Sequence, residues 1–274
     1  MGGTASVLRR RAATLAALGV ALAAYYAFHQ SLPEMTTWAD VAFLAFVLMP
    51  AVFALVWPAL PLRRAPGLAL LAPAFAVLAV ILHAAEAEPV ANFAKLGAMT
   101  ALAFWFLDYF ERLSWVVLVA ALIPFIDSLS VWRGPTRHIV TEQREVFTTL
   151  SFAFPIPGED ASANLGLPDL LFFGLFLGAA ARWGLRVGWT WLAMVLSFGA
   201  TMALAVAFDA DGLPALPGLA FTFLGVNGDR LLRAVRSRGE REPANGSHGH
   251  DVDRPAPAPD ANRSREHDAA RRGA

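Results

Sequence analysis

Two aspartates lie in or beside long apolar runs of this sequence, where a charge is costly. Asp127 falls inside the apolar run 115–132, and Asp169 directly precedes the run 170–181. A carboxylate at membrane depth costs several kcal/mol unless it is paired or functional. The polar loop between the runs makes the two helices antiparallel neighbours, and a rise of about 1.5 Å per residue puts both carboxylates near the same membrane surface. We therefore expect Asp127 and Asp169 to meet.

Two carboxylates held close together can act as a general acid and a general base. They share one proton and titrate as a unit, because both cannot ionise cheaply. The ionised group can take a proton from a water that attacks a carbonyl, while the protonated group polarises that carbonyl. Taken singly, Asp127 could instead be a carboxylate between packed helices, and Asp169 a first-turn residue favoured by the helix dipole.

The composition indicates a helical membrane protein. Hydrophobic residues make up 57% of the chain and the mean hydropathy is +0.50, more than a soluble domain usually shows. Successive runs of about 20 apolar residues fit a hydrocarbon core of about 30 Å and lack the alternation of barrel strands. A formal net charge of +0 indicates no nucleic-acid partner. Cysteine is absent, which excludes disulfides and thiolate sites, and no cofactor or metal is predicted.

We predict an all-α polytopic membrane protein with about eight transmembrane helices. Their approximate ranges are 12–28, 38–60, 68–83, 90–109, 115–132, 166–182, 187–208 and 214–230. The first run also fits a signal peptide, but the spans after it favour a retained helix. Three parts follow: an N-terminal four-helix part (1–112), a part that carries both aspartates (113–235), and a disordered polar tail (236–274).

Two details concern packing inside the bundle. Gly174 and Gly178 are spaced as in small-residue motifs that let a neighbouring helix approach closely. Asp40, Lys95 and Asp108 lie near predicted span ends and are interpreted as interface charges that reach water.

Lys and Arg residues predict the orientation. With eight spans, the arginines at 9–11, 63–64, 112, 182 and 186 share one side with the Arg-rich tail, and the acidic turns at 34, 86–88 and 209–211 lie on the other. The loop with Arg133, Arg137 and Arg144 is the exception. We predict that both termini are cytoplasmic.

Three segments carry a family resemblance. They are Phe125-Ile126-Asp127, Leu165-Gly166-Leu167-Pro168-Asp169 and Leu213-Pro214-Ala215-Leu216-Pro217. In this order and spacing they resemble the presenilin and signal peptide peptidase family of intramembrane aspartyl proteases, which shows Tyr-Asp, Gly-x-Gly-Asp and Pro-Ala-Leu on successive elements. The resemblance covers about residues 115–225. It implies a presenilin-like fold, catalytic roles for Asp127 and Asp169, and substrate binding by Gly166, Leu167, Pro168, Pro214, Ala215 and Leu216.

The sequence departs from the family pattern at two motif positions and in the helix count. Ile126 stands where the family has Tyr, which removes a hydroxyl from the site. Pro168 stands where the family has its second Gly; proline is tolerated in a first helical turn, since its missing N–H would be unpaired there. About eight spans are predicted where the family usually has nine.

The resemblance implies an intramembrane aspartyl endopeptidase of a prokaryotic plasma membrane. Its partners would be transmembrane helical peptides, such as signal-peptide remnants, and the lipid bilayer, with no oligomeric state predicted. Two alternatives stay open: a catalytically degenerate, presenilin-like binding protein, and a proton-coupled transporter whose paired acids relay protons.

A strand is also predicted in the loop before the sixth span. Residues 147–154 are rich in β-formers, and Pro155 and Pro157 end the run. We expect it to form an edge strand that pairs with an unwound substrate, with an ordinary amphipathic loop as the alternative.

The orientation can be tested with inserted tags. We expect tags at Arg64 and after Arg236 to be cytoplasmic and a tag near Glu159 to be outside, because arginines are retained on the cytoplasmic side. Protease protection in oriented vesicles measures this. A cytoplasmic tag at Glu159 would reverse the assignment.

Overall fold

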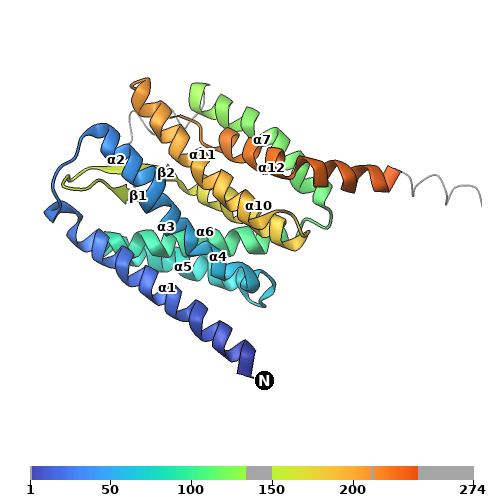
Figure 1. Cartoon of the computed structure of the whole chain (residues 1–274), viewed down its shortest axis with the longest axis horizontal. Coiled ribbons are helices and arrows are strands. Elements are labelled where there is room, and N and C mark those ends of the chain that lie inside the picture. Colours follow the sequence, from blue (N-terminus) through green and yellow to red (C-terminus); the bar gives the residue numbers. More distant parts are fainter. Residues whose placement is uncertain (1, 134–149, 211–212, 240–274) are drawn as a thin grey trace, which may run out of the picture. The chain divides into compact units, whose positions relative to one another are not determined.

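The computed structural model describes residues 2–133, 150–210 and 213–239. Within them the chain forms 8 helical segments and one antiparallel two-stranded sheet (Figure 1). Seven of the segments are α1 Gly2–Phe28, α5 Leu68–Ala84, α6 Glu88–Leu107, α7 Leu113–Arg133, α10 Leu167–Arg182, α11 Val187–Ala207 and α12 Leu216–Gly239. The other segment runs from Thr37 to Arg64, and the strands are β1 Ser151–Pro155 and β2 Ser162–Gly166. The short turn η1 His29–Ser31 follows α1.

Helices that could cross a membrane are present. Three segments are long and apolar enough to do so, namely Thr37–Arg64, α6 and α11, and two shorter helices, α5 and the Leu113–Leu129 part of α7, are also apolar. A mostly helical chain with three segments long and apolar enough to cross a membrane is thus confirmed. That all eight helices cross the membrane stays a prediction.

The segment Thr37–Arg64 changes its winding along its length. Its parts are α2 Thr37–Phe43, the π turn η2 Leu44–Leu48, α3 Met49–Ala54, α4 Val56–Ala59 and the 3-10 turn η3 Leu60–Arg64. Pro50 directly follows the start of α3, and a proline ring clashes with the carbonyl four residues earlier, here in the π turn. A wider turn at that point accommodates the ring.

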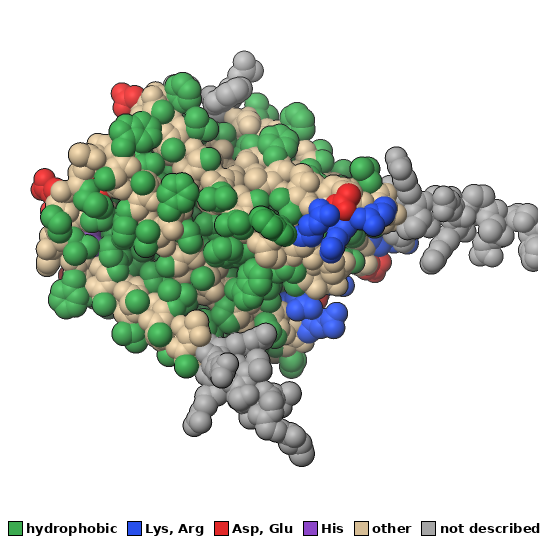
Figure 2. Space-filling view, in the orientation of Figure 1, with side chains coloured by type: hydrophobic (Ala, Val, Ile, Leu, Met, Phe, Trp, Pro, Cys, Tyr) green, Lys and Arg blue, Asp and Glu red, His purple; other side chains and the backbone are tan. Residues whose placement is uncertain are grey.

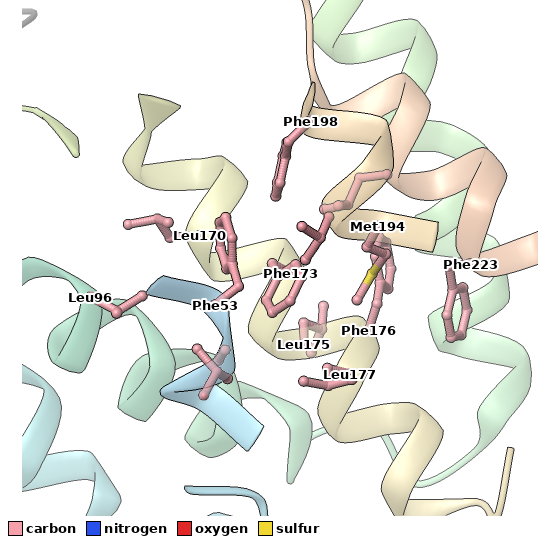
Figure 3. Close-up of a cluster of buried hydrophobic side chains, with 14 of the residues drawn as sticks. Phe53, Leu96, Leu170, Phe173, Leu175, Phe176, Leu177, Met194, Phe198 and Phe223 are labelled. Atoms are coloured by element: carbon pink, nitrogen blue, oxygen red, sulfur yellow. The ribbon is translucent and has the colours of Figure 1, made fainter. Parts of the chain in front are cut away.

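The core of the bundle surrounds α10. From Leu170 to Ala180 nearly every residue of α10 is buried, as expected of a helix that is apolar on all sides. Figure 3 shows Phe53 of α3, Phe173 of α10 and Phe198 of α11 gathered at its centre, with the rings of Phe53 and Phe173 4.3 Å apart. Phe176 stacks on Phe223 of α12 at 4.8 Å. Aromatic packing therefore joins α10 to the helices on both sides of it.

Glycines let α6 approach α10 closely, as predicted. A Cβ atom added at Gly174 would lie 2.9 Å from the Cβ of Ala103, and one at Gly178 would lie 3.1 Å from a methyl of Leu107. Both contacts are with α6. The spacing of Gly174 and Gly178 thus sets the distance between the two helices.

The loops divide between two ends of the bundle. At one end the loop between β1 and β2 contacts η1, where Gly158 N–H donates to the carbonyl of His29 (2.7 Å) and the Gln30 amide donates to Asp160 (2.8 Å). Arg63 and Arg64 end the segment that starts beside η1, so they lie at the opposite end. Figure 2 shows one face covered mostly by hydrophobic side chains, with Lys and Arg gathered at one end. Which end faces the cytoplasm stays a prediction.

The chain divides after Leu232, and the described residues before that point form a first compact unit. The predicted boundary between residues 112 and 113 falls inside the first unit, within which α6 packs on α10. The predicted tail lies outside the described residues from 240 onward, and α12 continues through the start of that tail to Gly239.

The close approach of α6 and α10 gives a stability prediction. We expect Gly174→Ala to lower the thermal unfolding midpoint in detergent, because overpacking typically costs about 1–3 kcal/mol. That loss should exceed the helix preference of alanine, about 0.5–1 kcal/mol. Circular dichroism measures the midpoint.

Gly225→Ala is the matched control, since a Cβ atom there would meet nothing within 4 Å. It should keep or raise the midpoint. An unchanged midpoint in Gly174→Ala would contradict the packing described for α6 and α10.

Candidate active site

Asp169 occupies the third position of α10, after the cap residue Gly166. The backbone N–H of Gly166 donates a hydrogen bond to the Asp169 carboxylate. This is half of a capping box, in which a side chain at the third position binds the cap N–H. Pro168 stands at the second position, where its missing N–H leaves no helical bond unmade. A Cβ atom at Gly166 would lie 3.1 Å from Asp169 Oδ2, so glycine there leaves room for the carboxylate.

Asp127 lies in α7, one turn after Pro124, and is half-buried. Its Oδ2 accepts a hydrogen bond from the backbone N–H of Leu216 (3.3 Å). Leu216 is the first residue of α12, so its N–H has no partner inside that helix. The carboxylate on α7 therefore satisfies the start of α12.

The structure brings the two aspartates into one site. α7 packs on α10, and the charges of Asp127 and Asp169 interact. Their backbone partners come from different elements: Gly166 from the end of β2 and Leu216 from the start of α12. The pair thus joins the three segments in which the sequence motifs occur.

The other predicted site residues flank the pair. Leu167 is half-buried and its N–H donates to the carbonyl of Leu150 (3.2 Å), while Pro168 is exposed. Pro214 is half-buried, and Ala215 and Leu216 are buried. Predicted substrate-binding residues therefore lie beside both carboxylates, Leu167 and Pro168 next to Asp169 and Pro214 to Leu216 next to Asp127.

Ile126, which replaces the family's tyrosine, is 63% exposed, and its neighbour Phe125 is also exposed. Both side chains lie on the surface of the bundle. The hydroxyl that a tyrosine would supply is therefore replaced by an apolar group facing out of the bundle.

The predicted strand is present in part, but its position and its free edge are wrong. β1 starts at Ser151; residues 147–149 lie outside the described part of the chain. A second strand, β2, separates β1 from α10 and pairs with it in the register Ser151↔Gly166 to Pro155↔Ser162. β2 could not be recognised beforehand, since Ser162 to Gly166 contains no β-branched or aromatic residue.

The outer edge of β1 is occupied by side chains of α1 and α6. The hydroxyl of Tyr25 donates to the carbonyl of Pro155 (2.6 Å), and that of Tyr26 to Ala153 (2.8 Å). From α6, the Asn92 oxygen accepts from Ala153 N–H (3.2 Å), and the Lys95 ammonium donates to the carbonyl of Ser151 (3.0 Å). β1 thus has no edge for a substrate.

The interpretation of Lys95 and Asp40 as interface charges is wrong. Lys95 is 7% exposed and holds the start of β1, and Asp40 is 5% exposed. The span-end positions of both residues suggested access to water, but the hairpin covers Lys95. Asp108 agrees with the interpretation, since its exposed side chain lies 3.7 Å from Arg182.

In the described part of the chain, the outer edge of β2 is free at Asn164 instead. Asn164 lies opposite Ala153, whose N–H and C=O both point away from β2. In an antiparallel ladder the opposite residue of such a pair also points its backbone groups outward. Among the described residues, nothing hydrogen-bonds to the N–H or C=O of Asn164 on that edge. This edge leads through Gly166 to Asp169.

The described residues contain no group of three His, Asp or Glu side chains arranged to hold a metal ion. Comparison with known proteins finds no matching family, no similar curated protein and no similar solved structure. The resemblance to intramembrane aspartyl proteases therefore depends on the three motifs and on the site that they form.

Proposed function

We propose that this protein is an intramembrane aspartyl endopeptidase that hydrolyses peptide bonds within transmembrane helices. The observation that carries the proposal is the pair Asp127 and Asp169, two interacting carboxylates on packed apolar helices. The proposed location is the plasma membrane, which is supported by three helices that could span a membrane. In the proposed orientation, both termini are cytoplasmic.

A structural role does not account for the pair. The bond to the cap N–H of α10 needs only one acceptor, and the uncharged side-chain amide of glutamine would supply it at the third position. Two carboxylates near each other in an apolar bundle repel unless they share a proton, so the arrangement lowers stability. Such pairs are typical of sites where proton transfer is the function.

The proposed reaction uses one shared proton and one water. The ionised aspartate removes a proton from water as its oxygen attacks the peptide carbon, and the protonated aspartate donates to the carbonyl oxygen. The tetrahedral intermediate then collapses, the C–N bond breaks, and the nitrogen leaves with a proton from the pair. As the carbonyl re-forms, one hydroxyl of the intermediate gives its proton to the ionised aspartate, so the pair again holds a single proton and the products are a carboxylic acid and an amine.

The dyad predicts a non-additive mutant pattern. We expect Asp127→Ala, Asp169→Ala and the double mutant to lose cleavage equally, because members of one catalytic unit are not additive. Detergent-purified protein is incubated with tagged transmembrane peptides, and products are identified by mass spectrometry.

Substantial cleavage by either single mutant would overturn the proposal. A wild-type protein that retains the peptides on a column but never cuts them would favour the binding-protein alternative. Proton flux in proteoliposomes, lost in both mutants, would favour the transporter.

We also propose that the substrate adds to β2 as a third strand. A helical peptide bond is shielded by its own hydrogen bonds, so it must unwind, and each unwound group needs a new partner in the membrane. At Asn164 the outer edge of β2 offers an N–H and a C=O to an extended strand, two residues before Gly166, whose N–H binds Asp169. This replaces β1 as the pairing strand.

Proline at residue 164 tests this edge. We expect Asn164→Pro to lower kcat/KM at least about tenfold, roughly 1.4 kcal/mol, because proline removes the N–H that a substrate carbonyl would accept. The N–H of Asn164 faces away from β1, so the hairpin itself is kept. Cleavage kinetics with one tagged peptide measure the effect.

Asn164→Ala is the control. It removes the side-chain bonds to Ser151 and to the Ser162 carbonyl, as proline also does, but keeps the backbone N–H. Equal kinetics of the two variants would show that the edge does not pair with substrate, even if the dyad is active.

A further inference from the structure

An apolar groove of about 300 Å³ lies between the end of the second helical segment, α5 and α6. Its lining includes Ala59, Leu62, Leu71, Phe75, Gly97 and Phe104. Thr100 is the one polar residue among the described residues that line it. The groove is separate from the aspartates, which lie on α7 and α10.

The groove opens on the surface of the bundle. Leu62 and Leu71 on its rim are 57% and 44% exposed. Gly97 has no side chain to fill it, and the ring of Phe75 would lie 3.4 Å from a Cβ atom added there. An apolar occupant can therefore enter sideways from the hydrocarbon region.

Arginines surround one end of the groove. Arg63 and Arg64 directly follow Leu62, and the charge of Arg182 also acts on Arg63. Arg182 donates to the carbonyl of Leu107 (2.7 Å), one helical turn beyond Phe104 of the groove. Positive charge therefore gathers where α6 ends.

Arg63 and Arg64 are not neutralised by a carboxylate of the described residues. Arg182 lies 3.7 Å from Asp108, but no carboxylate of the described residues forms an ion pair with Arg63 or Arg64. The Nε atom of Arg63 is buried and has no hydrogen-bond partner among the described residues. Arg63 as a whole is half-buried and Arg64 is exposed, so an anion outside the bundle can reach their guanidinium groups.

We propose that the groove and the arginines bind one anionic glycerophospholipid. An acyl chain fills the groove, and the phosphate group lies against Arg63 and Arg64. The lipid belongs to the leaflet at the arginine end of the bundle, and basic pockets between transmembrane helices are typical sites for anionic headgroups. The inference does not depend on the proposed proteolysis.

A substrate helix does not fit this groove. A helix with its side chains is about 10 Å wide, too large for the volume between α5 and α6. An unwound peptide would need hydrogen-bond partners along its length, and Thr100 alone offers one. An acyl chain needs none.

Lipid retention with matched headgroups tests the proposal. Full-length protein in mild detergent is exchanged against equimolar dioleoylphosphatidylglycerol and dioleoylphosphatidylcholine, which carry the same chains, and native mass spectrometry counts the bound lipids. We expect one retained phosphatidylglycerol per chain. A preference of about 30-fold over phosphatidylcholine corresponds to two arginines near the headgroup.

Two kinds of variant test the binding of the lipid headgroup and of the acyl chain separately. Arg63→Gln/Arg64→Gln should lose the preference, while Arg112→Gln/Arg230→Gln, with the same change of charge, should keep it. Gly97→Leu should abolish retention by filling the groove. Leu71→Trp blocks the exposed rim and serves if Gly97→Leu does not fold.

Three results would overturn the proposal. They are equal retention of both lipids by the wild type, an unchanged preference in Arg63→Gln/Arg64→Gln, and unchanged retention in every folded groove variant. Displacement of the lipid by a transmembrane peptide at a one-to-one ratio would also overturn it, because the groove would then be a peptide site.

Discussion

The structure depends on satisfying the backbone of a hairpin that is packed among apolar helices. Unpaired N–H and C=O groups cost several kcal/mol in such surroundings. Tyr25, Tyr26, Asn92 and Lys95 supply partners for the edge of β1 that does not face β2. Because α1 and α6 hold β1, they also fix the position of β2, which pairs with β1. β2 ends at Gly166, so the first turn of α10 is fixed as well. The place of Asp169 therefore depends on residues far from it in the sequence.

The same requirement fixes the second carboxylate. Leu216 begins α12 with a free N–H, which Asp127 accepts. The middle of α12 is held by Asn227, whose side chain accepts from Arg186 N–H (3.0 Å) and donates to Thr190 (2.8 Å). α12 is thus bound at its start to the carboxylate and at its middle to the helix before it. Each aspartate has a structural partner that keeps it in place, and what remains unfavourable is their mutual repulsion.

The helices could be predicted from the sequence, because apolar run length alone sets where a chain can be buried or cross a membrane. The predicted start of α5 and end of α10 agree with the structure to the residue. We expected Asp127 and Asp169 to be close because a single loop joins their two helices, which makes these helices antiparallel neighbours. β2 and the roles of Tyr25, Tyr26 and Lys95 could not be predicted in this way. Ser162 to Gly166 has weak strand preference, and its conformation comes from pairing with β1.

The asymmetry of the hairpin limits how a peptide could be opened under the proposed function. Among the described residues, the outer edge of β2 is free at Asn164, while the Ser162 carbonyl accepts from the Asn164 side chain and the Gly166 N–H donates to Asp169. A peptide added there has backbone partners on one side, and its other side faces no strand among the described residues. Unwinding beyond this edge would leave further groups unpaired at several kcal/mol each. A long unwound stretch is therefore unfavourable, so the bond presented to Asp127 and Asp169 must lie near one end of the substrate helix, where few hydrogen bonds need to be broken.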